Sequence, residues 1–428
     1  MALSWLSILA GTLPKRQLPR KSCSRSGGSI CYFNVTRRVQ LMDIVIVAAK
    51  RTPMGAFQGT LANLTAPELG ACAIAAAMAE VGLRGEQIDE AYLGNVLSAG
   101  VGQAPARQAV LKAGLPDSIP CTTVNKVCGS GMKAVMLAAD GLRLGDTKVV
   151  IAGGMESMSR APYLLDKARS GFRMGHQSVL DHMFLDGLQD AYEGQLMGHY
   201  AQLSADRAGL TRADMDAFAI ASLERALAAQ RSGAFAAELA PVMAVDTLLL
   251  AEDEQPAKAR PEKIPQLKPA FSKTGTITAA NASSISDGAA ALILMRSDTA
   301  AQLGLPVLAR LVGYQSHAAL PAEFTSAPIG AIKGLLAKVG WRVEEVDLFE
   351  VNEAFAMVSL LAMAGCQLPH DKVNVNGGAC ALGHPLGASG ARILVTLIHA
   401  LRERGLKRGV ASLCIGGGEA TAVAIELG

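Results

Sequence analysis

The sequence predicts an α/β protein with buried strands. Short apolar runs rich in β-branched residues alternate with longer segments in which apolar residues recur at helical spacing. This alternation is typical of sheets covered by helices. The chain has 428 residues, of which 50% are hydrophobic and 18% charged, so it is long enough to bury a large core. These proportions exclude a largely disordered chain, and the apolar runs are too short for a membrane span of about 20 residues.

Individual elements follow from local patterns. The expected strands are the β-rich apolar runs 44–48, 149–152, 348–351 and 411–415. The expected helices are the segments with helical apolar periodicity, 132–144, 212–232 and 391–404.

One arrangement of elements occurs twice. In each copy a Ser-Gly pair opens a helix, a strand follows, and a Gly-Gly pair and a glutamate come next. The first copy contains Ser130-Gly131, strand 148–151, Gly153-Gly154 and Glu156; the second contains Ser389-Gly390, strand 411–414, Gly416-Gly417 and Glu419. A helix, strand and glycine turn met twice predict two similar halves related by an approximate twofold axis.

A long insertion separates the two halves. From about residue 157 to 286 the strand and helix alternation breaks down, and the segment 253–269 is charged and contains prolines. Long insertions after a strand end commonly cover a substrate site. We therefore expect four regions: a leader at 1–41, an N-terminal half at 42–156, a loop domain at 157–286 and a C-terminal half at 287–428.

The leader differs in composition from the rest. Residues 1–41 hold seven of the 40 Lys and Arg and none of the 37 Asp and Glu, so the remainder is acidic with a net charge of −4. The basic pI of 8.4 is therefore no indication of a nucleic-acid partner. The leader has the composition of a mitochondrial transit peptide. Alternatively, translation starts at Met42, directly before the first strand, and the protein is cytoplasmic.

The eight cysteines are scattered without a CxxC pair, which favours neither a disulfide framework nor a zinc site. Cys128 stands out because it precedes Gly-Ser-Gly and an Ala-rich helix. A thiol at a helix N-terminus is expected to have a lowered pKa and to act as a nucleophile. The alternative is a small buried cysteine in a tight turn.

Two further segments have the features of catalytic loops. His384 has Gly383 before it and Pro385 after it, a setting that suits a base aimed into a pocket. Cys414 ends an apolar strand and leads into three glycines, whose N–H groups are suited to an oxyanion pocket. A turn with a buried cysteine is the alternative. Asn352 follows another strand and is expected either to bind a water or carbonyl oxygen or to cap a helix.

No GxGxxG follows the first strand and no GxxxxGK[ST] is present, which excludes the common nucleotide-binding loops. Taken together, residues 42–428 resemble the thiolase family. The runs that carry the resemblance are 51–53, 125–131, 153–159, 281–283, 352–355, 383–385 and 414–418. The resemblance implies the five-layered αβαβα thiolase fold with two similar halves and an inserted loop domain. It also implies a homotetramer built as a dimer of dimers.

The resemblance also implies a reaction. Two acetyl-CoA would condense to acetoacetyl-CoA and CoA, with thiolysis as the reverse; a degradative 3-ketoacyl-CoA thiolase is the alternative. Cys128 would be acylated while His384 takes its proton, and Cys414 would abstract the α-proton of the second substrate. One oxyanion hole would use His384 and a water held by Asn352, the other the N–H groups of Cys128 and Gly416.

Coenzyme A contacts are implied at the mostly apolar positions Leu188, Met197, Phe271, Ala279, Ser283, Ala354 and Phe355. Lys258 or Arg260 would lie near the phosphates. No metal or cofactor is expected, because the CoA thioesters are substrates. The chain departs from the family at 196–203, where a loop histidine is replaced and His199 and Tyr200 appear, and this leaves the chain-length preference open. Cys414 argues against a decarboxylating ketoacyl synthase, and the intact Cys128, His384 and Cys414 argue against a noncatalytic relative.

Overall fold

The computed structural model describes residues 43–244 and 247–428, so the predicted leader lies outside the described residues. The described part contains a ten-stranded mixed sheet. Its order is β12 (Leu348–Val351), β13 (Arg408–Ile415), β14 (Glu419–Glu426), β11 (Ala309–Ala318), β1 (Ile44–Arg51), β10 (Ser286–Arg296), β5 (Val149–Ser157), β3 (Glu90–Gly94) and β4 (Cys121–Val124), with β2 (Gly55–Ala56) paired to β10.

The sheet consists of two parts that meet at a short join. β1 pairs with β11 through only three residue pairs, from Ile44↔Leu311 to Ile46↔Ala309, whereas β1 follows β10 along its length. Each part ends in parallel strands, β12 with β13 on one side and β3 with β4 and β5 on the other. The remaining pairs are antiparallel.

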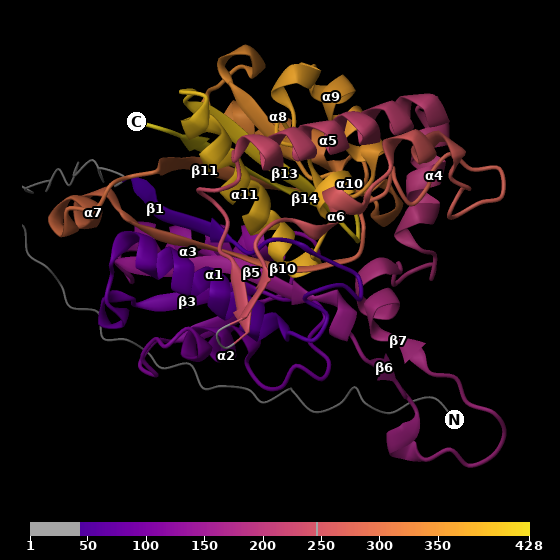
Figure 1. Cartoon of the computed structure of the whole chain (residues 1–428), viewed down its shortest axis with the longest axis horizontal. Coiled ribbons are helices and arrows are strands. Elements are labelled where there is room, and N and C mark those ends of the chain that lie inside the picture. Colours follow the sequence, from indigo (N-terminus) through magenta and orange to yellow (C-terminus); the bar gives the residue numbers. More distant parts are fainter. Residues whose placement is uncertain (1–42, 245–246) are drawn as a thin grey trace, which may run out of the picture. The chain divides into compact units, whose positions relative to one another are not determined.

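Helices separate and cover the two parts of the sheet. α1 (Ala66–Val81) and α2 (Pro105–Lys112) pack on the outer face of the N-terminal part. α8 (Ala327–Val339) and α9 (Ala356–Cys366) cover the C-terminal part. α3 (Ser130–Leu144) and α11 (Leu386–Glu403) share one buried cluster with the inner faces of both parts. The result is five layers in the order helix, sheet, helix, sheet, helix (Figure 1).

The central helices approach each other through small residues. α11 is buried from Leu386 to Leu401, as expected for a helix enclosed by the protein core. A Cβ on Gly131 would lie 2.9 Å from the backbone nitrogen of Ala391, and one on Gly390 would lie 2.5 Å from that of Met132. Glycine is therefore required where α3 and α11 cross.

The repeated pattern has different structures in the two halves. α3 leads to β5 and α11 leads to β13, as the sequence predicts. Gly153 and Gly154, however, lie inside β5 and not in a turn, so that part of the prediction is wrong. A Cβ on Gly154 would overlap the carbonyl oxygen of Gly387 at the start of α11, so close packing and not turning requires this glycine.

The segment between the halves contains the expected irregular structure. α5 (Arg212–Ser232) has the predicted bounds, because Thr211 forms a capping box and Gly233 ends the helix in the left-handed region. Its other strands and α-helices are β6 (Tyr163–Leu164), β7 (Leu180–Asp181), α4 (Met197–Arg207), β8 (Val242–Ala244), β9 (Thr247–Leu250) and α6 (Glu254–Lys258). The four region boundaries themselves stay predictions. Within the described residues no helix is long and apolar enough to cross a membrane.

β12 has the predicted bounds, while β5 extends past the predicted 152 to Ser157. α11 begins five residues before the predicted 391, at Leu386 directly after Pro385. The glycines of this segment hid the helix start, because glycine is unfavourable in exposed helices but not where two helices cross closely. This early start matters for the site, since it places Ser389 inside α11.

Candidate active site

A mostly apolar cavity of about 200 Å³ lies between the inserted segment and the two halves. Cys128, His384, Cys414 and Gly416 all line it, although they are far apart in the sequence. The wall is completed by bulky side chains that include Phe184, Phe271, Phe324, Phe355 and Leu386. The structure thus brings both predicted thiols and the predicted base to one enclosed space.

Cys128 lies in a strained turn between β4 and α3. The preceding Val127 has φ 45°, which is unfavourable for a β-branched residue. Two side chains hold this conformation. The Asn125 Oδ1 accepts from the Val127 N–H at 2.9 Å, and the Ser130 hydroxyl donates to the Val127 carbonyl at 2.6 Å and accepts from the Lys126 N–H at 2.8 Å. Such strain, held by its surroundings, directs the cysteine toward the cavity.

The predicted lowering of the Cys128 pKa is wrong. Burial raises the pKa of this thiol to about 11, while the N–H groups of Gly416 and of Cys128 itself act in the opposite direction. α3 begins at Ser130, so the thiol precedes the helix, and it is only 9% exposed. Burial also raises the pKa of Cys414 well above the ordinary value. Both thiols are therefore protonated at rest, and acylation needs a base.

His384 has the protonation state of such a base. The Ser389 hydroxyl donates to the Pro385 carbonyl at 2.8 Å, so in its 2.6 Å contact with the His384 Nδ1 it must accept a proton. The proton therefore sits on Nδ1, and Nε2 keeps a free lone pair. Nε2 is buried without a hydrogen-bond partner among the described residues. Burial, and after it the charge of Arg392, lowers the His384 pKa to about 3, which keeps the imidazole neutral.

Asn352 lies beside this histidine. Its Nδ2 is 3.4 Å from the His384 Nδ1, and its Oδ1 is buried without a partner in the described part of the chain. α9 begins at Ala356 with Phe355 at the N-cap, so the alternative that Asn352 caps a helix is wrong. Unsatisfied buried polar groups at a cavity are suited to bind a substrate oxygen or a water.

The next residue, Glu353, connects this loop to the inserted segment. Its carboxylate accepts from the Ser222 hydroxyl on α5 at 2.7 Å, from the Asn374 Nδ2 at 2.8 Å and from the Cys380 N–H at 3.0 Å. Asn352 is thereby held in register with both the loop before His384 and the covering segment.

Sequence reasoning missed the role of Glu156, which it used only as a marker of the repeat. This buried carboxylate accepts from the N–H groups of Val96, Leu97 and Gly387 and from the Asn95 side chain, at 2.8 to 3.1 Å. It thus joins the end of β5 to the start of α11. A carboxylate two residues after a glycine pair in a buried strand was the available signal.

The repeat's second glutamate, Glu419, is different. It is partly exposed and pairs with Lys126, two residues before Cys128. Glu419 begins β14, directly after the glycine turn that follows the Cys414 strand, so this ion pair joins that turn to the Cys128 turn.

The residues predicted to contact coenzyme A fall into two neighbouring cavities. Leu188, Met197, Phe271, Ser283, Ala354 and Phe355 line the cavity of the thiols. Ala279 instead lines a second cavity of about 300 Å³, which shares Ser284 with the first. Lys258 and Arg260 line this second cavity together with Lys263. The polar end of an extended ligand would therefore meet positive charge beyond the apolar space.

Only part of the unusual run 196–203 faces the cavity. Leu196, Met197 and Gly198 line it. Tyr200 is buried elsewhere, with its hydroxyl donating to Glu193 at 2.9 Å. The substitution that bears on the acyl chain is therefore Leu196, which makes this wall apolar.

Two buried thiols, a neutral imidazole and backbone donors around one cavity define a cysteine-dependent acyltransferase. The thiolase N-terminal domain matches residues 44–298 and the thiolase C-terminal domain matches residues 305–427. The chain belongs to the thiolase family.

Curated relatives match the sequence along nearly the whole chain. An acetyl-CoA acetyltransferase of Pseudomonas aeruginosa is 50% identical over 392 residues, which cover 90% of this chain and 99% of the relative. Acetyl-CoA acetyltransferase 2 of Arabidopsis thaliana is 49% identical over 400 residues, covering 92% and 99%.

Solved structures give the same result. The Acat5 thiolase of Ascaris suum in complex with coenzyme A has a TM-score of 0.86 and 43% identity, covering 90% of this chain and 100% of that chain. The Bacillus anthracis acetyl-CoA acetyltransferase has a TM-score of 0.88 and 40% identity, covering 90% and 99%. The predicted five-layered thiolase fold is confirmed.

Proposed function

We propose that this protein is an acetyl-CoA C-acetyltransferase, which condenses two acetyl-CoA to acetoacetyl-CoA and CoA and catalyses the reverse thiolysis. The observation that carries the proposal is the meeting of Cys128, Cys414 and a neutral His384 in one apolar cavity. The names of relatives that are about half identical over the whole fold support the acetyl reading.

The first half-reaction acylates Cys128. The lone pair on the His384 Nε2 takes the thiol proton, and the resulting thiolate attacks the thioester carbonyl of acetyl-CoA. The N–H groups of Cys128 and Gly416, which already face the sulfur, donate to the oxyanion. The tetrahedral intermediate then expels CoA, whose thiolate takes a proton from Cys414 and leaves as the free thiol.

The second half-reaction forms the carbon–carbon bond. Because the Cys414 pKa is raised, its thiolate is a strong base, which suits the weakly acidic α-proton of a second acetyl-CoA. The enolate attacks the acetyl group on Cys128, and acetoacetyl-CoA is released. The departing Cys128 thiolate recovers its proton from His384, so every proton is returned.

The binding of coenzyme A is proposed from the two cavities. The apolar cavity suits the pantetheine arm, with Ser283 as a polar contact, and the cavity lined by Lys258, Arg260 and Lys263 suits the phosphates. That the reaction uses no metal or cofactor stays a prediction.

The competing activity is degradative thiolysis of longer 3-ketoacyl-CoA, and the apolar Leu196 is the feature that favours it. The test is thiolysis by free CoA of 3-ketoacyl-CoA substrates from about four to sixteen carbons, compared as kcat/KM. Activity confined to the shortest substrate supports the acetyl reading, because the bulky wall excludes longer chains. Comparable kcat/KM on long chains would instead assign the protein to degradation.

Assembly as a homotetramer is also a proposal. The segment around the β6–β7 hairpin exposes large apolar side chains, namely Tyr163, Leu165, Phe172, Met174 and Val179. Contiguous exposed apolar residues commonly mark contact surfaces. Light scattering of the wild type and of a Phe172→Glu, Met174→Glu variant tests this proposal. The variant should form a smaller assembly than the wild type. A variant with the same mass as the wild type would contradict a role of this segment in assembly.

A further inference from the structure

The buried helix α11 carries a polar stripe through the apolar core. Ser389, Arg392, Thr396 and His399 are spaced three or four residues apart, which places them on one face of the helix. All four are buried. Each contacts a different part of the molecule: Ser389 the His384 ring, Arg392 Glu350 on β12, Thr396 Glu238 of the inserted segment, and His399 the carbonyl of Ala49 on β1.

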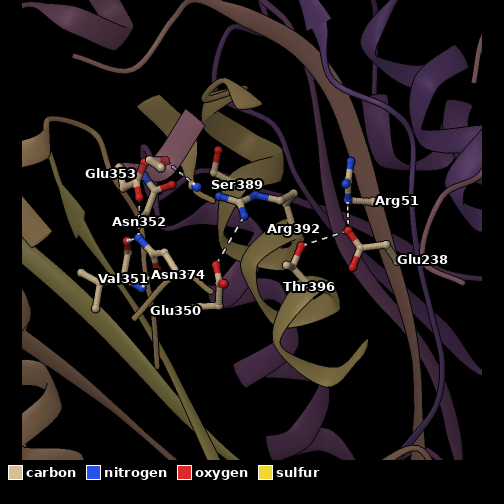
Figure 2. A network of polar contacts seen from close by, with 12 residues as sticks. Arg51, Glu238, Glu350, Val351, Asn352, Glu353, Asn374, Ser389, Arg392 and Thr396 are labelled. Atoms are coloured by element: carbon tan, nitrogen blue, oxygen red, sulfur yellow. Dashed lines mark hydrogen bonds and ion pairs between the residues drawn. The ribbon is translucent and has the colours of Figure 1, made fainter. Parts of the chain in front are cut away.

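The Arg392–Glu350 contact joins α11 to β12, with Ser389 and Asn352 nearby (Figure 2). Glu350 lies on β12, and Asn352 is the first residue after this strand, where its N–H donates to the Ser412 carbonyl on β13 at 3.0 Å. The Glu350 Oε2 is 3.5 Å from the Arg392 Nη1. Asn352 approaches His384, whose other contact is Ser389, one turn before Arg392. The Arg392–Glu350 contact is therefore adjacent to the one that orients the proposed base.

The charge of Arg392 is only partly compensated. Its side chain is buried, and none of its three nitrogens has a hydrogen-bond partner among the described residues. Burial raises the pKa of Glu350 to about 8 and lowers the pKa of Arg392, while the two opposite charges act against both shifts. The other charged groups that act on Arg392 are Arg51, Glu238 and Glu353.

Those groups are engaged elsewhere. Glu238 accepts from Arg51 at 2.5 Å and from Thr396 at 3.2 Å, and Glu353 accepts from groups of the covering segment and of the His384 loop. Around His384 itself stand Ser389, Asn352 and the two thiols of the cavity. Arg392 follows Ser389 by three residues on the same face of α11, and its charge adds to burial in lowering the His384 pKa.

We propose that Arg392 is a positioning residue for His384: it fixes the end of β12 against α11 and places a buried positive charge behind the imidazole, so that the ring remains an unprotonated acceptor. This inference rests on the proposed function, because it concerns the proton transfer from Cys128. It assigns catalytic importance to a residue that does not line the substrate cavity.

The test compares wild type with Arg392→Met, Arg392→Lys and Glu350→Gln, with Thr396→Val as the matched control on the same helix face. The kcat/KM for thiolysis of acetoacetyl-CoA is measured between about pH 5 and 8, because this profile reports ionisations of the free enzyme. Circular dichroism and active-site titration by acetylation correct each rate for folded enzyme.

For Arg392→Met we expect kcat to fall about ten- to a hundredfold with little change in KM, because the base is misplaced. An acid limb should also appear, since loss of the positive charge raises the imidazole pKa and protonates the base at low pH. Arg392→Lys should restore the flat acid side, because it keeps the charge. Glu350→Gln should also keep it, and Thr396→Val should match the wild type.

Folded Arg392→Met with the wild-type pH profile would overturn the proposal, as would an acid limb of equal size in Arg392→Lys. If Arg392→Met does not fold, Arg392→Gln, which also removes the charge, takes its place and should show the same acid limb. Failure of the proposed function is distinguishable, because the wild-type enzyme would then lack thiolysis at every pH.

Discussion

Cys128 and Cys414 line the same cavity but are carried by different kinds of backbone. Cys128 sits in a strained turn ahead of α3, held by the side chains of Asn125 and Ser130. Cys414 lies near the end of β13, inside regular antiparallel pairing with β14, and is only 1% exposed. The turn directs the Cys128 sulfur toward the cavity, whereas the strand holds the Cys414 sulfur at a fixed position in the cavity wall.

The two residues are both cysteines, so their different backbone settings must account for the different roles of Cys128 as nucleophile and Cys414 as base. Burial raises the pKa of both thiols, so neither is activated by its position in the chain. The N–H groups of Gly416 and of Cys128 both act to lower the Cys128 pKa, which favours a developing negative charge on that sulfur. At Cys414 only its own N–H acts in this direction and the Cys128 sulfur acts against it, so the strong basicity of its thiolate suits proton abstraction.

The largest effect is expected from Cys128→Ala. The variant should lose acyl-enzyme formation and more than about a thousandfold in thiolysis, because no other group can form the covalent intermediate. Steady-state thiolysis and mass analysis after mixing with acetyl-CoA measure both quantities. Substantial residual turnover would show that the strained turn does not present the nucleophile.

The pH dependence of Cys128 alkylation gives the next largest effect. With a pKa near 11, the thiolate fraction rises with pH throughout the neutral range, so the rate of iodoacetamide labelling should rise about tenfold per unit between about pH 7 and 9. A Cys128→Ala control identifies the labelled site. A rate that levels off near neutrality would instead indicate a thiolate–imidazolium pair with His384.

The glycines that follow the two helices sharpen the comparison. Gly154→Ala should destabilise the fold by about 1–3 kcal/mol, because its Cβ would overlap the start of α11. Gly416→Ala should fold normally, since the nearest heavy atoms to its Cβ would be the Met197 Sδ at 3.4 Å and the Val127 Cγ1 at 3.7 Å. Chemical denaturation measures both, and equal losses of stability would contradict the different roles of the two sites.

The smallest effect is expected at the ion pair between the Cys128 turn and the glycine turn after Cys414. Glu419→Gln removes the ion pair with Lys126, and because both side chains are partly exposed the loss of stability should stay below about 1 kcal/mol. Thermal unfolding and kcat check this. A loss of activity as large as that of a thiol variant would mean that the pair, and not the backbone, sets the distance between the cysteines.

Much of the fold was predictable because its signals are local. α5 has the predicted bounds through Thr211 and Gly233, and β12 is a short buried run in which three of the four residues are apolar. The Gly153–Gly154 pair was misjudged because its reasons are contacts distant in the sequence: a Cβ on Gly153 would overlap Ala290 on β10, and one on Gly154 would overlap Gly387 on α11. The early start of α11 was missed for the same reason, because its glycines are explained by close packing with distant segments.

The candidate site was predictable in its residues but not in its electrostatics. Glycine-rich contexts and the family resemblance indicated Cys128, His384 and Cys414, and the structure brings all three to one cavity. The pKa of Cys128 was assigned the wrong direction, because the helix is visible in the sequence whereas burial is not. Ser389 and Arg392 act through tertiary contacts of a buried helix, and no local sequence pattern predicts such contacts.

The most direct test of the account is whether the Cys414→Ala variant is acetylated by acetyl-CoA, which is the first half-reaction alone. After mixing with acetyl-CoA, peptide mass analysis should find one acetyl group per chain, on Cys128, while condensation is lost. Cys128→Ala treated alike should carry none. Acetylation of another residue, or an unmodified Cys128 in Cys414→Ala, would contradict the assignment of nucleophile and base to the two thiols.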